Sequence, residues 1–366
     1  MNNYEFWEKY LEDVKRAISK KCRTKDTLQI DLHIHSTYSA DGRQTIGEIL
    51  ESTKELGFDI ISITDHDTLN AYDELYEYVK DGLTDPIVVP GIEFTIDHRE
   101  YGNQCHMLQL FLNPKDKTIM KDVETNYKAL FKRSKKQFKR IHDNLALTEI
   151  IKKNKIKISY DNYIDYLEEN NMCPEYDTLM SYLMKEFKKK KITCFDVLSL
   201  LEKYNQDDPF ADRREIKRKQ YQRLRGKYPM DKMNEYNIRF LLSMLAPREV
   251  DDDWWDSPSS GSLSVNSFGQ LKVGDINDKY DIYFAHPTEK SLPVVDQIIK
   301  GKKNLIGMEL NKRCPYKDIN HFYTVLKDNH MIQIIGSDSH DSSLQFYDDL
   351  AFYRIKSGDV KKIIER

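Results

Sequence analysis

The chain has 366 residues, and its 57 basic residues are nearly balanced by 60 acidic ones, which gives a formal net charge of −3. This length is enough for two domains, or for one large domain that carries an insertion. The near-neutral charge removes whole-protein charge as an argument for binding nucleic acid or membranes, although local basic patches are compatible with it.

The cysteines indicate a protein of a reducing compartment, and the apolar residues indicate no signal peptide or membrane span. The five cysteines are odd in number, widely spaced and never paired as C-x-x-C, which argues against a disulfide framework. The N-terminal segment lacks the apolar core of a signal peptide, and no uninterrupted apolar run approaches the ~20 residues that a membrane span needs. We therefore expect a cytoplasmic protein without membrane association.

The first 112 residues carry alternating signals for helices and strands. Apolar residues between Tyr4 and Lys20 recur at three- and four-residue steps, which predicts an amphipathic helix within residues 1–27. Short apolar runs then alternate with helix-like stretches, as is typical of a parallel or largely parallel α/β sheet. The expected strands are Leu28–Ile34, Phe58–Thr64, Pro86–Phe94 and Gln104–Leu112, and the expected helices are Thr45–Leu56 and Leu69–Val79.

A long charged segment interrupts this rhythm from residue 113 to residue 280. Its apolar residues, such as Phe131 and Phe138, follow helical spacing, and Ser159 is placed to cap a further helix. The rhythm resumes with apolar runs at Asp281–Ala285, Leu292–Ile299, Asn304–Leu310 and Met331–Gly336, and a helix near Ile319–Leu326. We therefore divide the chain into an N-terminal helix (1–27), a first α/β part (28–112), a helical insertion (113–280) and a second α/β part (281–366).

Two pairs of candidate metal ligands lie at the ends of expected strands. His33 and His35 are two residues apart on a strand, so both side chains project to one face and can hold one metal ion. Asp338 and His340 repeat this spacing directly after the last strong apolar run. Because the carboxyl ends of parallel strands converge on one crevice, residues that are distant in sequence can meet there.

Further acids and histidines accompany the other strands. His66, Glu93 and His286 follow strands, and His106 opens or lies within the fourth expected strand. Imidazole and carboxylate groups suit zinc, manganese or iron, so the joint pattern predicts a metal site. Taken singly, each residue has an ordinary alternative as a surface, loop or core residue, and Asp41 is also typical of a turn.

These segments resemble the PHP family, the polymerase and histidinol phosphatase superfamily of metal-dependent phosphoesterases. The resemblance implies an α/β fold, a distorted seven-stranded (β/α) barrel with a large, mostly α-helical insertion. Members similar to the nucleotide phosphatases and 5′-end exoribonucleases carry an inserted helical domain at the same position. The matching segments are Asp31–Ser36, Ser39–Gly42, Ile63–Thr68, Gly91–Glu93, His106, Ala285–Pro287, Gly307–Glu309 and Gly336–His340.

The resemblance also implies two or three divalent metal ions, namely Mn, Zn or Fe, and a role for each residue of the site. The implied ligand sets are His33, His35, Glu93 and Asp338 for one ion, Glu93, His106 and His286 for a second, and Asp41, His66 and His340 for a third. Glu93 and Asp338 are also catalytic candidates. Asp65 is a third catalytic candidate, as a proton donor to the leaving group. Alternatively, Asp65 and Asp67 orient His66 or cap the next helix.

The reaction implied is hydrolysis of phosphomonoester or phosphodiester bonds of nucleotides or oligonucleotides by a metal-activated hydroxide. Many relatives place an arginine after the His-Pro pair, whereas this chain has Thr288-Glu289-Lys290. Arg43, Lys290 and Arg313 are therefore the candidates for binding the substrate phosphate. The alternatives are a small-molecule phosphatase of the histidinol phosphate type, and a metal-stabilised binding or regulatory module that acts with a partner protein.

The insertion contains two basic runs, one between Lys128 and Lys157 and one between Arg213 and Lys227. Such runs favour a nucleic-acid substrate, and their alternative is a solvated helix face. The acidic cluster Asp251–Asp256 opposes phosphate binding, and its tryptophans are an alternative surface for a protein partner. The tyrosines that could stack on bases are Tyr160, Tyr163, Tyr166, Tyr221 and Tyr228.

Overall fold

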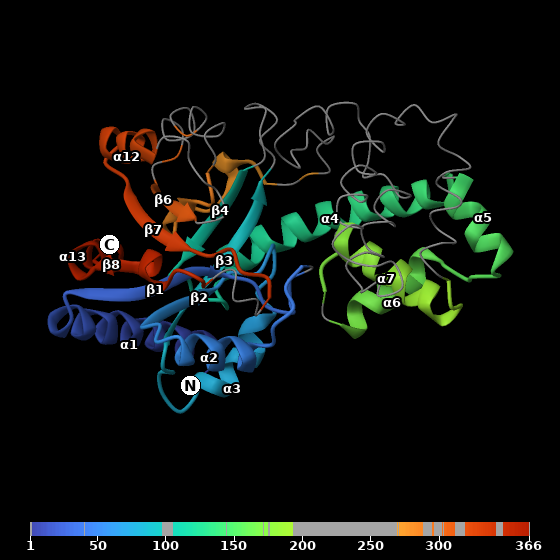
Figure 1. The fold of residues 1–366 in the computed structure, drawn as a ribbon. Helices are drawn as coiled ribbons and strands as arrows, with labels where there is room; N and C mark the ends of the chain where they lie inside the picture. The colour runs from blue at the N-terminus through green and yellow to red at the C-terminus, as the bar shows by residue number, and fades with distance from the viewer. Residues whose placement is uncertain are drawn as a thin grey trace. The chain divides into compact units, whose positions relative to one another are not determined.

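The fold was obtained as a computed structural model of the chain (Figure 1). The structure describes residues 2–39, 41–96, 105–143, 145–170, 172–174, 176–192, 269, 271–287, 295, 302, 304–311, 319–341 and 347–365. The chain divides into two compact units, one formed by Met1–Ala129 with Asp253–Arg366 and the other by Leu130–Asp252.

Helix α1 (Asn3–Thr24) confirms that a helix lies within residues 1–27. It starts with a capping box, in which the Asn2 side chain accepts from the Glu5 backbone N–H and Glu5 accepts from Asn2 N–H. Its apolar stripe is buried against the barrel, where the Tyr10 hydroxyl donates to the Val88 carbonyl at 2.9 Å. The helix is therefore a structural element of the first unit.

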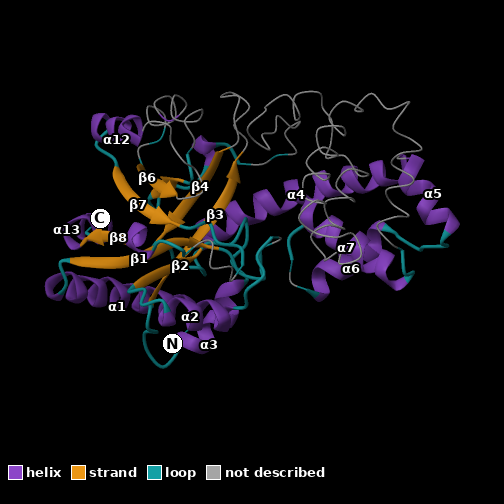
Figure 2. Cartoon of the chain, viewed as in Figure 1, coloured by secondary structure: helices purple, strands orange, loops and turns teal. Residues whose placement is uncertain are grey.

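The first unit is built on a sheet of eight strands in the order β7-β6-β5-β4-β3-β2-β1-β8 (Figure 2). Pairing is parallel among β1, β2 and β3 and again among β5, β6 and β7. Strand β4 runs antiparallel to both of its neighbours, so the sheet is less parallel than predicted. The strands are β1 (Thr27–Ile34), β2 (Ile60–Ile63), β3 (Ile87–Ile96), β4 (Cys105–Leu110), β5 (Ile282–Phe284), β6 (Leu305–Asn311), β7 (Ile332–Gly336) and β8 (Arg354–Lys356).

The sheet curls into a nearly closed barrel because the end of β1 pairs with the segment after β7. The His35 N–H donates to the Ser339 carbonyl at 2.9 Å, and the Asp338 N–H donates to the His33 carbonyl at 2.9 Å. This confirms the predicted α/β barrel, although the sheet has eight strands, because β8 pairs antiparallel with the first half of β1. The expected strands of both α/β parts are present, apart from the run at Leu292–Ile299, of which the structure describes only Val295.

Helices cover the barrel and bury apolar side chains against it. Helix α2 begins with a second capping box, between Thr45 and Glu48, and its buried face includes Ile46 and Ile49. Helix α13 packs against α1, β7 and β8. Besides α1, the described helices that lie wholly in this unit are α2 (Ile46–Glu55), α3 (Ala71–Val79), α12 (Ile319–Asp328) and α13 (Ser357–Ile364).

The second unit has a helical core of its own. Phe138, Leu147, Leu183 and Phe187 are among its buried residues, and Ser159 caps α6 by accepting from the Asn162 N–H, as predicted. Helix α4 begins in the first unit and ends in the second. Among the described residues, none of the helices combines the length and the apolar character of a membrane span. The described helices of the second unit are α4 (Lys117–Asp143), α5 (Leu145–Lys153), α6 (Tyr160–Glu169) and α7 (Tyr176–Lys189).

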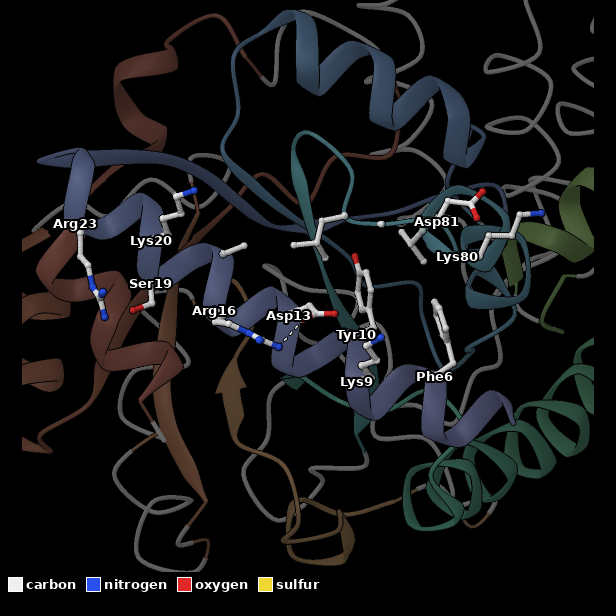
Figure 3. Close-up of a pocket in the computed structure, with 14 residues that line it drawn as sticks. Phe6, Lys9, Tyr10, Asp13, Arg16, Ser19, Lys20, Arg23, Lys80 and Asp81 are labelled. Carbon is white, nitrogen blue, oxygen red and sulfur yellow. Dashed lines mark hydrogen bonds and ion pairs between the residues drawn. The ribbon is translucent and has the colours of Figure 1, made fainter. Parts of the chain in front are cut away.

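A groove of about 740 Å³ lies on the first unit, between α1 and the turn that follows α3 (Figure 3). Its walls carry several charged side chains, including Arg16, which pairs with Asp13 at 2.6 Å. None of the residues that line it is a candidate site residue, so the chemistry predicted from the sequence lies elsewhere.

Candidate metal centre

Strand geometry brings the predicted residues of β1, β2 and β3 together. His33 and His35 lie at the end of β1 with fully buried side chains. His66 follows β2 and forms an isolated parallel bridge with Glu93 of β3, so these two residues stand side by side. Because the three strands are parallel, their carboxyl ends place all four side chains at one end of the barrel.

His106 reaches the same end of the barrel by a different route. It is the second residue of β4, and because β4 is antiparallel to β3, the start of β4 lies beside the end of β3. Its Nδ1 atom lies 3.0 Å from Glu93 Oε1. His286 follows β5, and its Nε2 atom lies 3.1 Å from the same oxygen.

Glu93 is the centre of this arrangement and is fully buried. Its Oε2 atom lies 3.0 Å from His33 Nε2, 3.2 Å from His35 Nε2 and 3.1 Å from His66 Nδ1. Together with the contacts of Oε1, one carboxylate therefore meets ring nitrogens of five histidines, which are His33, His35, His66, His106 and His286.

The remaining three candidates, Asp338, Asp41 and His340, contact His35, His66 or one another. Asp338 Oδ1 lies 3.2 Å from His35 Nε2, and Asp41 Oδ2 lies 2.8 Å from His340 Nε2. His66 Nε2 is 3.8 Å from the same Asp41 oxygen. The structure thus gathers all nine predicted ligands in one cluster.

Three groups within this cluster have ligand atoms that all lie within 4.8 Å of one another, as a metal site requires. The first is the predicted set of His33, His35, Glu93 and Asp338. The second adds His35 to the predicted set of Asp41, His66 and His340. The third has His66 in place of the predicted His286, which belongs to none of the three groups. The groups are His33, His35, Glu93 and Asp338; His35, Asp41, His66 and His340; and His66, Glu93 and His106.

The donor atoms fit a cation better than they fit one another. Glu93 Oε2 and His66 Nδ1 are buried 3.1 Å apart, yet they do not form a hydrogen bond with each other. A buried polar atom without a partner is costly, whereas coordination of a metal ion would satisfy both atoms. Nitrogen and oxygen donors without thiolate suit zinc, manganese or iron.

The electrostatics of the cluster point to the same conclusion. Burial alone would lower the pKa of His35, but hydrogen bonds to Asp338 and Glu93 outweigh it and raise that pKa to about 10. Burial lowers the pKa of His66 to about 3. The pKa values of Glu93 and Asp338 lie far below the usual range, despite burial, because the neighbouring histidines favour the carboxylates. Both acids are therefore carboxylate anions, which are suited to binding a cation.

Asp65 and Asp67 flank His66 but are occupied by other partners. The two oxygens of Asp65 accept from the backbone N–H and the hydroxyl of Ser36, each at 2.6 Å. Asp67 accepts from Thr95 N–H and from the Asn126 side chain at 2.7 Å. Neither caps α3, whose N-cap is Asn70. The hydrogen bonds of Asp65 are to Ser36 and not to His66, so its roles as a residue that orients His66 or as a proton donor stay predictions.

Two buried acids near the cluster were not among the predicted site residues. Asp31 accepts from the Ser337 N–H at 2.9 Å and from Tyr347, and burial raises its pKa to about 6. Glu309 of β6 is fully buried and contacts His33 Nδ1. A signal for both was present in the sequence, since Asp31 precedes His33 by two residues and Glu309 is an acid within a buried apolar strand.

Only one of the three candidates for phosphate binding lies within the described residues. Arg43 is exposed, and its backbone N–H donates to the His340 carbonyl at 2.8 Å, which places it next to the cluster. Lys290 and Arg313 lie outside the described residues, as do Arg213–Lys227 and Asp251–Asp256.

Comparisons with known proteins identify the family of the chain. The PHP domain family profile matches residues 31–215, slightly more than half of the chain. A phosphoribosyl 1,2-cyclic phosphate 1,2-diphosphodiesterase of Eggerthella lenta is 40% identical over 83 residues, which cover 22% of this chain and 29% of that protein. The chain therefore aligns with less than a third of that relative.

One solved structure shares the fold. A Bifidobacterium adolescentis protein assigned to the metal-dependent phosphoesterases has a TM-score of 0.51 and 17% identity, covering 85% of this chain and 87% of its own. An amidohydrolase of Chromobacterium violaceum has a TM-score of 0.48 and 14% identity, covering 91% and 99%. From the profile match and the shared barrel, the chain belongs to the PHP-domain family of metal-dependent phosphoesterases.

Proposed function

We propose that this protein hydrolyses phosphomonoester or phosphodiester bonds of nucleotides or oligonucleotides at a site for two or three divalent metal ions, Mn, Zn or Fe. The observation that carries the proposal is the buried carboxylate of Glu93, which contacts ring nitrogens of five histidines. A purely structural zinc site has four ligands and a closed coordination sphere, whereas nine nitrogen and oxygen donors leave positions open for water and substrate.

The ligands would divide among the ions as the family resemblance implies, with Glu93 shared between two of them. Bound divalent ions would supply an activated water nucleophile and neutralise charge on the phosphate oxygens. The proposed sets are His33, His35, Glu93 and Asp338; Glu93, His106 and His286; and Asp41, His66 and His340.

The chain's own residues would orient this cluster and bind the substrate. Asp65, through its two hydrogen bonds to Ser36, fixes the start of the loop that carries Asp41. Arg43 in the same loop is exposed beside His340 and would bind a phosphate oxygen as a bidentate donor.

Nucleic acid is supported as a substrate by the charges of the second unit. Lys132, Lys135 and Lys139 of α4 are exposed, as are Lys152 and Lys153 of α5. Such a surface can contact a phosphate backbone, whereas a small substrate has no need of it. One tyrosine expected to stack on bases is unsuited to that role, because Tyr163 is fully buried and pairs with Thr178.

A cyclic phosphate diester is a second substrate to test, because the E. lenta relative is named for hydrolysing one. The manganese-loaded protein would be assayed against mononucleotides, histidinol phosphate, a ribose 1,2-cyclic phosphate, and 5′-phosphorylated RNA and DNA oligonucleotides. Turnover of oligonucleotides would support the proposal. Turnover of mononucleotides would support it as well, but would remove the argument from the basic surface of the second unit. Turnover of histidinol phosphate alone would replace it with the small-molecule phosphatase, and turnover of the cyclic phosphate alone would replace it with the cyclic phosphodiesterase. Metal binding without any turnover would favour a binding or regulatory module.

A further inference from the structure

Glu309 lies on β6, which pairs with β5 and β7 in the barrel sheet. Its side chain is fully buried, although a carboxylate is costly to bury unless its oxygens accept hydrogen bonds. It is not one of the nine predicted ligands, and it belongs to none of the three groups that could hold a metal ion. Its burial therefore needs an explanation of its own.

Four contacts occupy the two oxygens of Glu309. Oε1 lies 3.1 Å from His33 Nδ1 and accepts from the Asn311 side chain at 3.0 Å. Oε2 lies 3.0 Å from His33 Nδ1 and accepts from the backbone N–H of His286 at 2.6 Å. One carboxylate therefore contacts two of the histidines that meet Glu93.

The contact with His33 sets the state of its ring. A carboxylate can only accept, so Nδ1 must carry the proton, and Nε2 is left with its lone pair in the neutral ring. Nε2 lies 3.0 Å from Glu93 Oε2 and 3.6 Å from Asp338 Oδ1. The lone pair that a metal ion would use therefore faces the cluster.

The contact with His286 acts on the backbone. His286 has φ = 28°, in a region that residues with a Cβ rarely adopt, and such a conformation persists only when its surroundings hold it. The short hydrogen bond from its N–H to Glu309 is one such restraint. It holds the turn after β5 from which the imidazole of His286 reaches Glu93.

The structure also keeps space for this carboxylate. A Cβ atom on Gly336 would lie 2.2 Å from Glu309 Oε1 and 2.5 Å from His33 Cβ. Both distances are too short for any side chain, so glycine at the end of β7 makes room for the contact between Glu309 and His33.

We propose that Glu309 is a positioning residue, which orients His33 and His286 and thereby sets the affinity of the cluster for divalent metal ions. This inference rests on the proposed function, in which both histidines are ligands. Carboxylates that hold a ligating histidine through its second nitrogen typically change metal affinity by about 10- to 100-fold when they are removed.

The test is the Mn²⁺ affinity of the full-length protein, measured by calorimetric titration of the metal-free form. Glu309→Gln keeps the size of the side chain but removes its charge, and we expect it to weaken binding by about 10- to 100-fold. Asp122→Asn is the matched control. Asp122 is also a buried carboxylate, but it accepts from Asn277 and contacts no histidine of the cluster. We expect this control to keep the wild-type affinity.

Two further measurements separate positioning from loss of structure. In ¹⁵N-histidine spectra of the metal-free protein, Glu309→Gln should reduce the Nδ1–H tautomer signal of His33, while far-UV circular dichroism stays unchanged. Glu309→Asp, which keeps a shorter carboxylate, should recover part of the affinity and serves in place of Glu309→Gln if that variant does not fold.

Equal Mn²⁺ affinity in the wild type and both Glu309 variants would overturn the role of Glu309 and leave the proposed function standing. Equal losses in Glu309→Gln and Asp122→Asn would also overturn it, because the effect would then be a general consequence of removing a buried charge. A wild-type protein that binds none of Mn²⁺, Zn²⁺ and Fe²⁺ would instead overturn the proposed function itself.

Discussion

The backbone N–H of Asp338 donates a hydrogen bond to the carbonyl of His33, over 2.9 Å. This single bond joins the loop after β7 to the end of β1, and it places the carboxylate of Asp338 3.6 Å from His33 Nε2. The same hydrogen bond thus closes the barrel and positions a candidate metal ligand. Changes that weaken the pairing of β1 with the loop after β7 should therefore also weaken metal binding.

Replacing Glu93 with glutamine should have the largest effect of any single change in the cluster. The amide keeps the shape of the side chain but removes the negative charge that five histidines surround. We expect phosphoesterase activity to fall by more than about 100-fold. Mutation of a residue that only holds a metal ligand in place already lowers metal affinity or activity by about 10- to 100-fold. The measurement is kcat/KM at saturating Mn²⁺ together with metal content, and a variant with wild-type values for both would refute the central role of Glu93.

Gly336→Ala should disrupt the contact between Glu309 and His33. The added methyl group would lie 2.2 Å from Glu309 Oε1, so the side chains must move. Overpacking of this kind costs typically ~1–3 kcal/mol of unfolding free energy. Gly358→Ala on α13 is the control, because its Cβ would meet nothing within 4 Å. Urea unfolding and Mn²⁺ titration of both variants check this, and equal stability of the two would show that the barrel accommodates the methyl group.

Divalent metal ions should stabilise the protein against heat. Ligands that bind only the folded state add stability by mass action, by ~2.7 kcal/mol at a concentration 100-fold above Kd. We expect Mn²⁺ to raise the unfolding temperature of the metal-free wild type, and EDTA to reverse the rise. The increase should be smaller in His35→Ala, since His35 belongs to two of the three ligand groups. A rise of the same size in both proteins would mean that Mn²⁺ binds elsewhere.

The ion pair between Asp116 and Lys279 should contribute stability that depends on pH. Burial alone would raise the pKa of Asp116, but hydrogen bonds from Lys279 and Thr118 outweigh it and lower that pKa to about 2 from its usual 3.8. Because the folded-state pKa is depressed, this stability is complete above pH ~4 and is lost as the pH falls towards 2.

Asp116→Asn should therefore be less stable than the wild type at pH 7 by about 1–2 kcal/mol, with the lower value favoured because Lys279 is nearly half exposed and water screens the pair. The difference should shrink between pH 4 and pH 2. Urea unfolding at several pH values measures it, and a difference that stays constant or grows on acidification would contradict this role of Asp116.

Much of the fold was predictable from the sequence, because buried strands and amphipathic helices leave clear periodic patterns. His33 and His35 could be paired from their spacing alone, and their strand could be placed to within one residue. The direction of β4 could not be predicted, since an apolar run does not show whether a strand is parallel, and only that direction explains why His106 meets Glu93. The three-residue strand β8 was too short to give a pattern.

The environment of the candidate site was harder to predict than its members. The sequence places Asp65 beside His66, but it does not show that Ser36 occupies both of its oxygens. Likewise, the role of Glu309 depends on contacts with residues from β1 and from the turn after β5, which come together only in the folded barrel. Residue types and strand ends are local properties, whereas hydrogen-bond partners are set by tertiary structure.

The most direct test of the account is to follow phosphoester hydrolysis while Mn²⁺ is titrated into the metal-free protein, with the wild type and Asp338→Ala measured side by side. The account predicts that wild-type activity is absent without metal, rises with bound Mn²⁺ and reaches a plateau, while the variant remains at background. Hydrolysis by the metal-free wild type, or wild-type turnover by the variant, would contradict it.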